Sequence, residues 1–296
     1  MKTKDLFGYN LMGPLKFEVN EEFKYEMIMD NNYYNLENNS VRVQQLHTEY
    51  IRTIKENPEE NVWFTNIKWK SVRFRNTQDK PWMQWTFPLK TSFDSTLYRL
   101  PEVEKKQAMF GGDVFNREGE QNEKLAKAFK MFPKLPSVYL MIMQAFDIIT
   151  FESYTSIIHS NNEIMNSKGN FIKINEISGK KSGIGIGIGK YDEKSKFVNG
   201  DFYLRHLGYG IYNERLCAIF EYYCDNSDVK VSEETVGEEK KGKSFYQGHL
   251  RLDVSNGNII YGDMIENYFN STEGHQREFI KRSVKLELIN NINEEW

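Results

Sequence analysis

The segment Tyr246-Gln-Gly-His-Leu-Arg-Leu-Asp-Val254 decides the fold class of this chain. Its Leu and Val residues alternate with His, Arg and Asp, which is the period-2 pattern of a strand with one buried and one solvated face. Asn256-Gly257 follows directly. This dipeptide is typical of a type I′ turn, because it tolerates positive φ at both central positions. The segment therefore predicts the first strand of an antiparallel hairpin.

Further strands are predicted on both sides of this hairpin. Two follow it, at 259–269 and 279–288, and from Gly169 onward roughly eight strands succeed one another with short turns between them. The N-terminal part adds strand candidates at about 15–29, 41–55, 62–76 and 82–93, separated by Asn-rich or Pro-containing turns. This order predicts an up-and-down antiparallel meander.

Two helices are predicted between the two groups of strands. The stretch from Glu120 to Phe132 carries apolar residues at helical spacing and is ended by Pro133. Ser137 can cap a second helix, which runs to about His159 and is almost free of charge. A membrane span needs about 20 predominantly apolar residues, and polar residues interrupt this helix too soon. We therefore expect the second helix to be buried by the sheet.

A long meander leaves edge strands that must be hidden, and curling the sheet around an apolar helix is one solution. We therefore predict a β-rich α+β protein, in which a large curved antiparallel meander sheet, as a partial or closed barrel, packs around a buried central helix. We expect one continuous domain. Its parts are N-terminal antiparallel strands at 1–93, a loop or lid at 94–120, a helical insert at 121–160 and a C-terminal meander at 161–296.

The composition describes a folded, soluble chain without a strong electrostatic field. Apolar residues make up 39% of the 296 residues, and 39 basic against 42 acidic residues give a formal charge of -3. Nucleic acids favour concentrated Lys and Arg, so we expect no nucleic-acid partner, while a local basic patch stays open. The aromatic share of 14% fits either an aromatic-lined cavity or an ordinary β core, and the second is the general rule.

The cysteines and the N-terminus bear on the compartment. Cys217 and Cys224 lie on one predicted strand at opposite parity, too far apart to bridge there, so we expect free thiols. Free thiols favour a reducing compartment. No signal peptide is visible after Met1, so we expect the cytoplasm if Met1 is native, and an extracytoplasmic location if a signal peptide was removed.

No motif points to a metal, a cofactor or a catalytic centre. The five histidines are dispersed, without a second ligand two or four residues away, and the chain has no CxxC. It also has no Gly-x-Ser-x-Gly elbow. We expect no metal and no cofactor. The sequence favours a non-enzymatic protein without deciding the question, because catalytic groups meet in space rather than in sequence.

The run Gly183-Ile-Gly-Ile-Gly-Ile-Gly-Lys190 invites comparison with nucleotide-binding loops, but its spacing is wrong. A phosphate-binding loop would need Gly at position 184, which is Ile. The run instead predicts a strand with a bare backbone face that includes Gly185 and Gly187. Such a face lets a helix, a strand or a ligand come close, and packing against the buried helix is the commoner use.

Three further side chains are candidates for ligand contact. Trp82 and Trp85 belong to the densest aromatic group of the chain, and their faces can bury a large area. On strand alternation Trp85 shares the core face, while Trp82 faces the other way. Asp147 lies within the apolar helix, where a dry carboxylate is a general-base candidate but is more often paired or hydrogen-bonded.

Three functions stay open. The first is a non-enzymatic protein that binds an apolar or amphipathic, lipid-like molecule in a cradle between sheet and helix. Its ligand-binding residues would be Trp82, Trp85, Asp147, Gly185 and Gly187. The second is a structural or self-assembling protein, whose aromatic surfaces and sheet edges pair between copies. The third is a carbohydrate-active or hydrolytic protein that uses Trp82 and dispersed carboxylates.

Overall fold

The computed structural model describes ten segments of the chain. They are residues 20–36, 39–57, 62–76, 81–86, 92–99, 138–167, 169–180, 196–233, 238–272 and 275–291.

Long antiparallel strands and one long helix make up most of these segments. The strands before the helix are β1 (Glu22–Asn35), β2 (Ser40–Asn57), β3 (Val62–Arg75), β4 (Met83–Thr86) and β5 (Ser92–Arg99). The helices are α3 (Val138–Ser160) and α4 (Asn162–Met165). The strands after them are β6 (Ile172–Lys173), β7 (Lys196–Val198), β8 (Asp201–Tyr212), β9 (Arg215–Glu233), β10 (Glu238–Asp253), β11 (Ile259–Thr272) and β12 (His275–Asn291).

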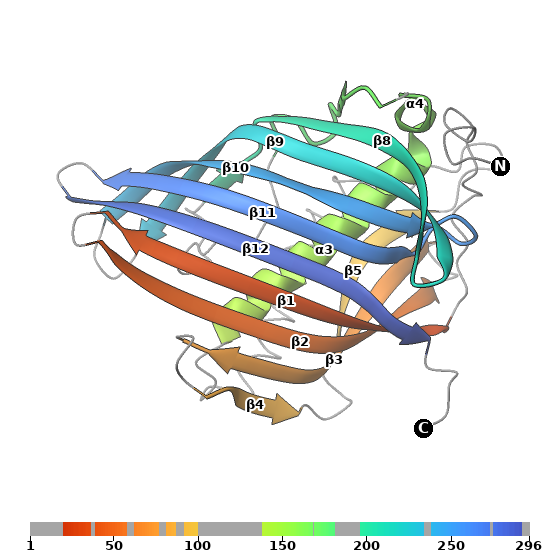
Figure 1. Cartoon of the computed structure of the whole chain (residues 1–296), viewed down its shortest axis with the longest axis horizontal. Coiled ribbons are helices and arrows are strands. Elements are labelled where there is room, and N and C mark those ends of the chain that lie inside the picture. Colours follow the sequence, from red (N-terminus) through yellow and green to blue (C-terminus); the bar gives the residue numbers. More distant parts are fainter. Residues whose placement is uncertain are drawn as a thin grey trace.

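All the strands belong to one curved sheet, in which each hydrogen-bonded pair is antiparallel. The order is β4-β3-β2-β1-β12-β11-β10-β9-β8-β6, while β5 pairs with β3 and β7 with β9. The first and last strands therefore lie side by side in the middle of the sheet and join its two halves (Figure 1). Within the described segments no pairing joins β4 to β6, so this sheet is open.

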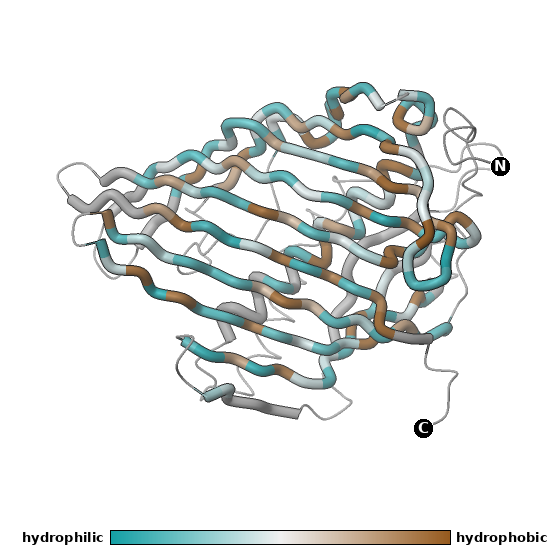
Figure 2. The backbone as a smooth tube through the Cα atoms, in the orientation of Figure 1, coloured by the Kyte–Doolittle hydropathy of each residue, from teal (hydrophilic) through white to brown (hydrophobic). Residues whose placement is uncertain are grey.

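The concave face of the sheet holds α3, which crosses several strands obliquely (Figure 1). Apolar and polar residues alternate along the strands, as the colours of Figure 2 show, and in β1 the buried positions are every second residue from Phe23 to Asn31, all of them apolar except Asn31. This alternation turns the apolar side chains toward the helix. Every side chain of α3 from Asp147 to Ile158 is buried, because the helix contacts both β5 and β11.

The predicted fold class is confirmed: a large curved antiparallel meander packs around a buried helix. The helix expected from about residue 137 to 159 is α3. The strand expected at 82–93 is instead the short β4 and the start of β5, and β5 continues to Arg99, into the expected loop at 94–120. The rest of that loop and the helix expected from Glu120 to Phe132 lie outside the described residues.

The hairpin of β10 and β11 is confirmed, but the predicted type I′ turn at Asn256-Gly257 is wrong. The connection spans residues 254–258, and of this dipeptide only Gly257 has a positive φ, 75°. Asn256 caps the turn with its side chain, because its Oδ1 accepts the backbone N–H of Asn258 at 3.0 Å. Positive φ at both central residues occurs between β8 and β9, at Asn213 (47°) and Glu214 (61°).

Candidate ligand site between the sheet and the helix

The helix–sheet interface contains a buried ionic centre around Arg282 of β12. Its guanidinium donates to both carboxylate oxygens of Asp147 in α3, with Nη1–Oδ2 at 2.5 Å and Nη2–Oδ1 at 3.0 Å. Its Nε donates to Glu266 of β11 at 2.9 Å, and Ser244 Oγ donates to the other oxygen of Glu266 at 2.6 Å. The side chains of Arg282, Asp147 and Glu266 are at most 1% exposed. This centre ties α3 to the middle of the sheet.

The charges in this centre stabilise one another. Burial by itself lowers the pKa of Arg282, but the carboxylates of Asp147 and Glu266 more than compensate and raise it above its ordinary value. A buried guanidinium that pairs with two carboxylates offsets part of the large desolvation penalty that each charge would suffer alone. Both oxygens of Asp147 are held by Arg282, so this carboxylate has the structural pairing considered from the sequence rather than the setting of a poised general base.

Asn31 of β1 lies next to the ionic centre. It is the Cα partner of Arg282 in the pairing of β1 with β12, so both side chains leave the sheet on its inner face. Its side chain is fully buried, and neither Oδ1 nor Nδ2 has a hydrogen-bond partner among the described residues. A buried amide without partners costs about 1–3 kcal/mol. Asn31 is therefore a buried amide whose hydrogen-bonding groups are unused among the described residues.

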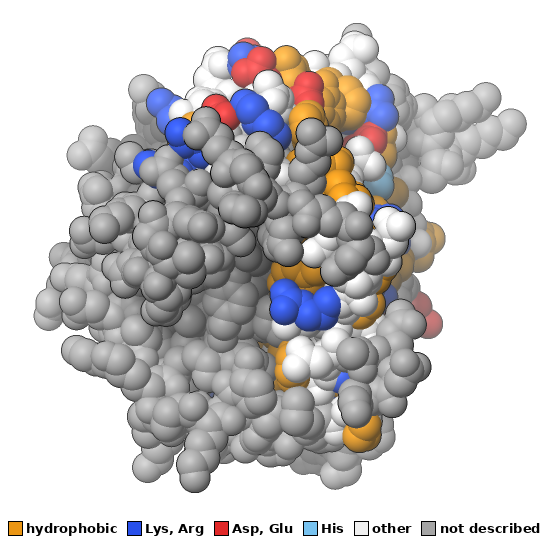
Figure 3. Space-filling model, turned by 90° about the vertical axis from the view of Figure 1, so that its left-hand side faces the viewer, with side chains coloured by type: hydrophobic (Ala, Val, Ile, Leu, Met, Phe, Trp, Pro, Cys, Tyr) orange, Lys and Arg blue, Asp and Glu red, His pale blue; other side chains and the backbone are white. Residues whose placement is uncertain are grey.

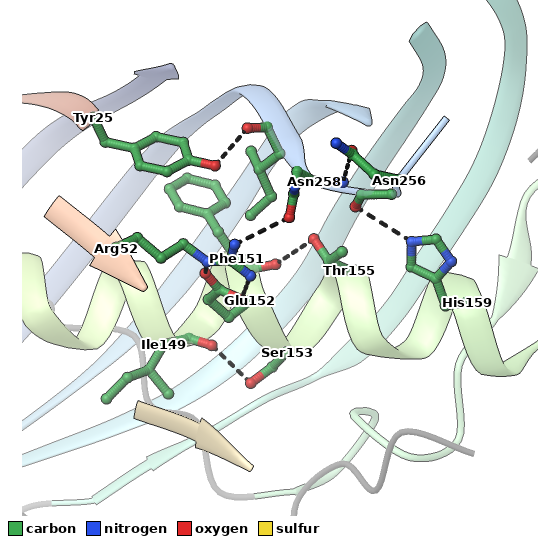
Figure 4. A network of polar contacts seen from close by, with 12 residues as sticks. Tyr25, Arg52, Ile149, Phe151, Glu152, Ser153, Thr155, His159, Asn256 and Asn258 are labelled. Carbon is green, nitrogen blue, oxygen red and sulfur yellow. Dashed lines mark hydrogen bonds and ion pairs between the residues drawn. The ribbon is translucent and has the colours of Figure 1, made fainter. Parts of the chain in front are cut away.

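A second polar contact joins α3 to the N-terminal strands one and a half turns further along the helix. Arg52 of β2 donates to Glu152 through Nε at 2.6 Å and Nη2 at 3.2 Å, and through Nη1 to Asn258 Oδ1 at 3.0 Å. Tyr25 Oη donates to the carbonyl of Ile259 at 2.8 Å, and its burial raises its pKa. Figure 4 shows how these side chains converge from β1, β2, α3 and the turn after β10.

Aromatic side chains form the wall of the interface beside the ionic centre. Tyr154 of α3 packs against Phe202 and Tyr222, with ring centroids 4.8 and 5.0 Å apart. Its hydroxyl donates to that of Tyr246 at 3.2 Å, which donates to Asn199 Oδ1 at 2.9 Å. Burial raises the pKa of Tyr154, Tyr222 and Tyr246 well above the ordinary value, so these phenols stay neutral.

The bare backbone that lets the helix approach lies in β11. A Cβ at Gly262 would meet the ring of Phe151 at 3.4 Å and Leu250 Cδ2 at 3.2 Å. The stripe proposed for that role, with Gly185 and Gly187, lies outside the described residues. Helix packing against bare strand backbone thus occurs in this fold at a position that carries no glycine run.

Of the candidate side chains, the structure describes those of Trp82 and Asp147, and these two lie apart. Trp82 is 39% exposed, with Arg75 4.5 Å from its ring, and Arg75 is on the outer face of β3 because its neighbour Phe74 is buried. Trp85 pairs with Val72 in the β3–β4 ladder, and its side chain is not described. Asp147 lies on the opposite face of the sheet from Trp82, within the ionic centre.

Arg282 and Glu266 were not predicted as site residues, but their positions in the sequence carry a recognisable pattern. Arg282 lies at the same strand parity as Ile280, Val284 and Leu286, and Glu266 lies between Met264 and Tyr268 on the core face of β11. A charged residue at a core position of an alternating strand needs a buried partner. The sequence contains both charged residues, but it does not show that β11, β12 and α3 contact one another in the folded protein.

The described segments contain no group of three or more His, Cys, Asp and Glu side chains placed to hold a metal ion. None of their helices is long and apolar enough to cross a membrane. Cys217 and Cys224 are buried, free thiols, as expected.

Comparison with known proteins does not indicate a function for this chain. No protein-family model matches the chain, and no curated protein matches its sequence. Among solved structures, OccK7 (OpdD) of Pseudomonas aeruginosa has 8% identity over 90% of this chain and 98% of its own, with a TM-score of 0.28. OprB of Pseudomonas putida has 7% identity over 90% and 92%, also with a TM-score of 0.28. A DUF1329 family protein from Desulfovibrio piger has 8% identity over 94% and 89%, with a TM-score of 0.14. Likenesses this weak carry no argument about what the chain does, so its function has to be inferred from the geometry between sheet and helix.

Proposed function

We propose that the protein binds an apolar or amphipathic, lipid-like molecule between α3 and the inner face of the sheet, without changing it chemically. The observation that carries the proposal is Asn31, a fully buried amide without a partner among the described residues, beside the ionic centre of Arg282. A polar group of the ligand would satisfy this amide. The aromatic and aliphatic walls around it suit the apolar body of the same ligand.

The inner face offers both polar and apolar groups to an amphipathic molecule. Beside the first half of α3 it carries Asn31, the ionic centre and Gln144, which accepts from Thr48 at 2.7 Å. Beside the second half it carries the rings around Tyr154 and the buried Ile157, together with the ion pair of Arg52 and Glu152. Asp147 holds Arg282 in place. Trp82, on the outer face, would serve only a ligand bound there.

Native mass spectrometry of protein purified without detergent tests the proposal, because it reports bound small molecules and oligomeric state together. We expect a lipid-like mass on the wild type. In the stripped protein, Asn31→Leu should weaken rebinding of a lysophospholipid by about tenfold, the worth of one buried hydrogen bond. Asn32→Leu is the matched control, because it changes the next residue, which lies on the other face of β1.

A second readout separates binding from a structural role of Asn31. If the amide awaits a ligand, Asn31→Leu should raise the free energy of unfolding of the stripped protein by about 1 kcal/mol, since it removes an unsatisfied buried group. A loss of stability, together with wild-type protein that carries no ligand and binds no lysophospholipid, would refute the proposal.

Self-assembly is the second candidate, favoured by an aromatic row on the outer face. Tyr34 of β1 stacks on Phe279 of β12 at 5.2 Å, and Phe279 stacks on Phe269 of β11 at 4.7 Å. Phe269 is 48% exposed and Val41, opposite Tyr34, is 53% exposed. Exposed contiguous apolar surface often marks an interface.

Light scattering during size-exclusion chromatography tests this second candidate. Assembly through the row predicts an oligomer that Phe269→Ser dissociates. The matched control is Ile211→Ser, which changes an exposed apolar residue in the hairpin between β8 and β9. A wild type that stays monomeric at high concentration excludes assembly by this surface.

A further inference from the structure

If the inner face binds an amphipathic molecule, as the proposed function holds, the amide of Asn31 restricts the head group of that molecule. The amide has an acceptor, Oδ1, and two donor hydrogens on Nδ2. Both atoms are buried, and neither has a hydrogen-bond partner within the described part of the chain. A ligand that satisfies the whole amide therefore needs a donor for Oδ1 and an acceptor for Nδ2.

Arg282 is a cation beside Asn31, but the protein itself occupies it. The two residues are directly opposite each other in the pairing of β1 with β12. Nη1 and Nη2 of Arg282 donate to the two oxygens of Asp147 at 2.5 and 3.0 Å, and Nε donates to Glu266 at 2.9 Å. An arginine binds carboxylates along these edges of its guanidinium. The carboxylate of a ligand would therefore meet a guanidinium that already holds two carboxylates of the protein.

A charged head group suits this position poorly. An ionised carboxylate only accepts hydrogen bonds and would leave Oδ1 of Asn31 unpaired, while an ammonium group only donates and would leave Nδ2 unpaired. Either charge would also have to leave water for the surroundings of a side chain that is 0% exposed. Burying a charge without a counter-ion of its own is costly. A neutral group that both donates and accepts avoids these costs.

We propose, on the basis of that function, that the ligand carries a primary carboxamide, or another neutral group with donor and acceptor on one edge, at the end of an apolar chain. Oδ1 and Nδ2 of Asn31 lie on one edge of a planar group, so a second primary amide can exchange two hydrogen bonds with them. A trans secondary amide has its N–H and C=O on opposite edges and can exchange only one. The next inner-face pair, Met29 and Val284, is apolar and buried, which suits the chain of the ligand.

Asn31 lies near one end of the sheet, where apolar surface is exposed. The strand ends at Asn35, four residues further on, which is about 13 Å along the strand. Leu36, Val41 and Phe269 are about half exposed at this end. Figure 3 views the molecule from this end and shows hydrophobic side chains beside basic ones on the described surface. Apolar surface is therefore within reach of a ligand chain whose head group is bound at Asn31.

Competition between probes for the stripped, full-length protein, measured by native mass spectrometry, tests the proposal. The probes are dodecanamide, undecyl methyl ketone, dodecanoate and dodecylamine, which have chains of similar length and different head groups. The ketone has the shape of the amide, with a methyl group in place of NH2, so it accepts but does not donate. We expect dodecanamide to bind about tenfold tighter than the ketone, the worth of one buried hydrogen bond, and at least as much tighter than the two charged probes.

Two variants assign this preference to Asn31. Asn31→Leu should abolish the preference for the amide over the ketone, because leucine neither donates nor accepts a hydrogen bond. Asn32→Leu changes the next residue, on the other face of β1, and should keep the tenfold preference of the wild type. Each preference is a ratio of two affinities for the same variant, so a general loss of stability does not alter it.

Failure of the head-group assignment and failure of the proposed function give different results. Binding of dodecanoate, dodecylamine or the ketone as tightly as dodecanamide would overturn the carboxamide while lipid binding itself stands. An Asn31→Leu variant that still prefers the amide would also overturn it, since another residue would then recognise the head group. Wild-type protein that binds neither these probes nor a lysophospholipid would overturn the proposed function together with the carboxamide.

Discussion

Replacing Arg282 by Met should destabilise the protein more than any other single change at the helix–sheet interface. The variant removes three charge-assisted hydrogen bonds of 2.5, 3.0 and 2.9 Å, and it leaves Asp147 and Glu266 buried without their cation. Breaking a buried ion pair by removing one partner costs about 3–5 kcal/mol. A domain is stable by only about 5–15 kcal/mol, so this loss is a large fraction of its free energy of unfolding.

Urea unfolding followed by circular dichroism measures this loss.

Two further variants make the test specific. Arg282→Met/Asp147→Asn/Glu266→Gln removes the buried charges together and should regain much of the lost stability. Arg205→Met breaks a pair with Glu221 whose side chains are about 30% exposed, and should cost no more than about 1 kcal/mol. A loss below about 1 kcal/mol for Arg282→Met, or a triple variant as unstable as the single one, would refute the assignment of this centre.

Other sites give independent predictions. Burial lowers the pKa of His159 to about 4, so stability should fall by up to about 3 kcal/mol as pH drops from 6.5 to 4, and His159→Gln should abolish this dependence in urea unfolding. Burial raises the pKa of Cys217 to about 11 and also raises that of Cys224. A thiol-reactive disulfide reagent at pH 8 should therefore label neither cysteine until denaturant is added, and rapid labelling of the native protein would contradict this. A Cβ at Gly248 would lie 1.9 Å from the carbonyl oxygen of Asp263, so Gly248→Ala should lower the free energy of unfolding by about 3 kcal/mol or more. The control Gly210→Ala should cost much less, because a Cβ there would meet only a side-chain methyl group, at 3.1 Å. Equal melting temperatures of the two variants would show that the strands separate freely at Gly248.

The fold was predictable because its signals are local. Alternation in the segment that became β10 and the nearly uncharged stretch of α3 each act within one element. The turn at Asn256 was predicted wrongly, since an Asn side chain that accepts a backbone N–H offers an alternative to the two-residue turn. The candidate site was harder to predict from the sequence. Arg282 and Asp147 are 135 residues apart, and only the curvature of the sheet brings them together. Asn31 looks from the sequence like any other polar residue of an Asn-rich strand.

The pairing of β1 with β12 sets the order in which this protein can be completed. Ile28 pairs with Lys285 at the centre of the sheet, so the first strand of the sheet must wait for the last one to be synthesised. At translation rates of about 5–20 residues per second, that wait is roughly 13–50 s. During that time β1 is an exposed edge, open to pairing with another chain. The newly made N-terminal strands are therefore a natural point of contact for chaperones, and a slow codon late in the message would prolong the hazard.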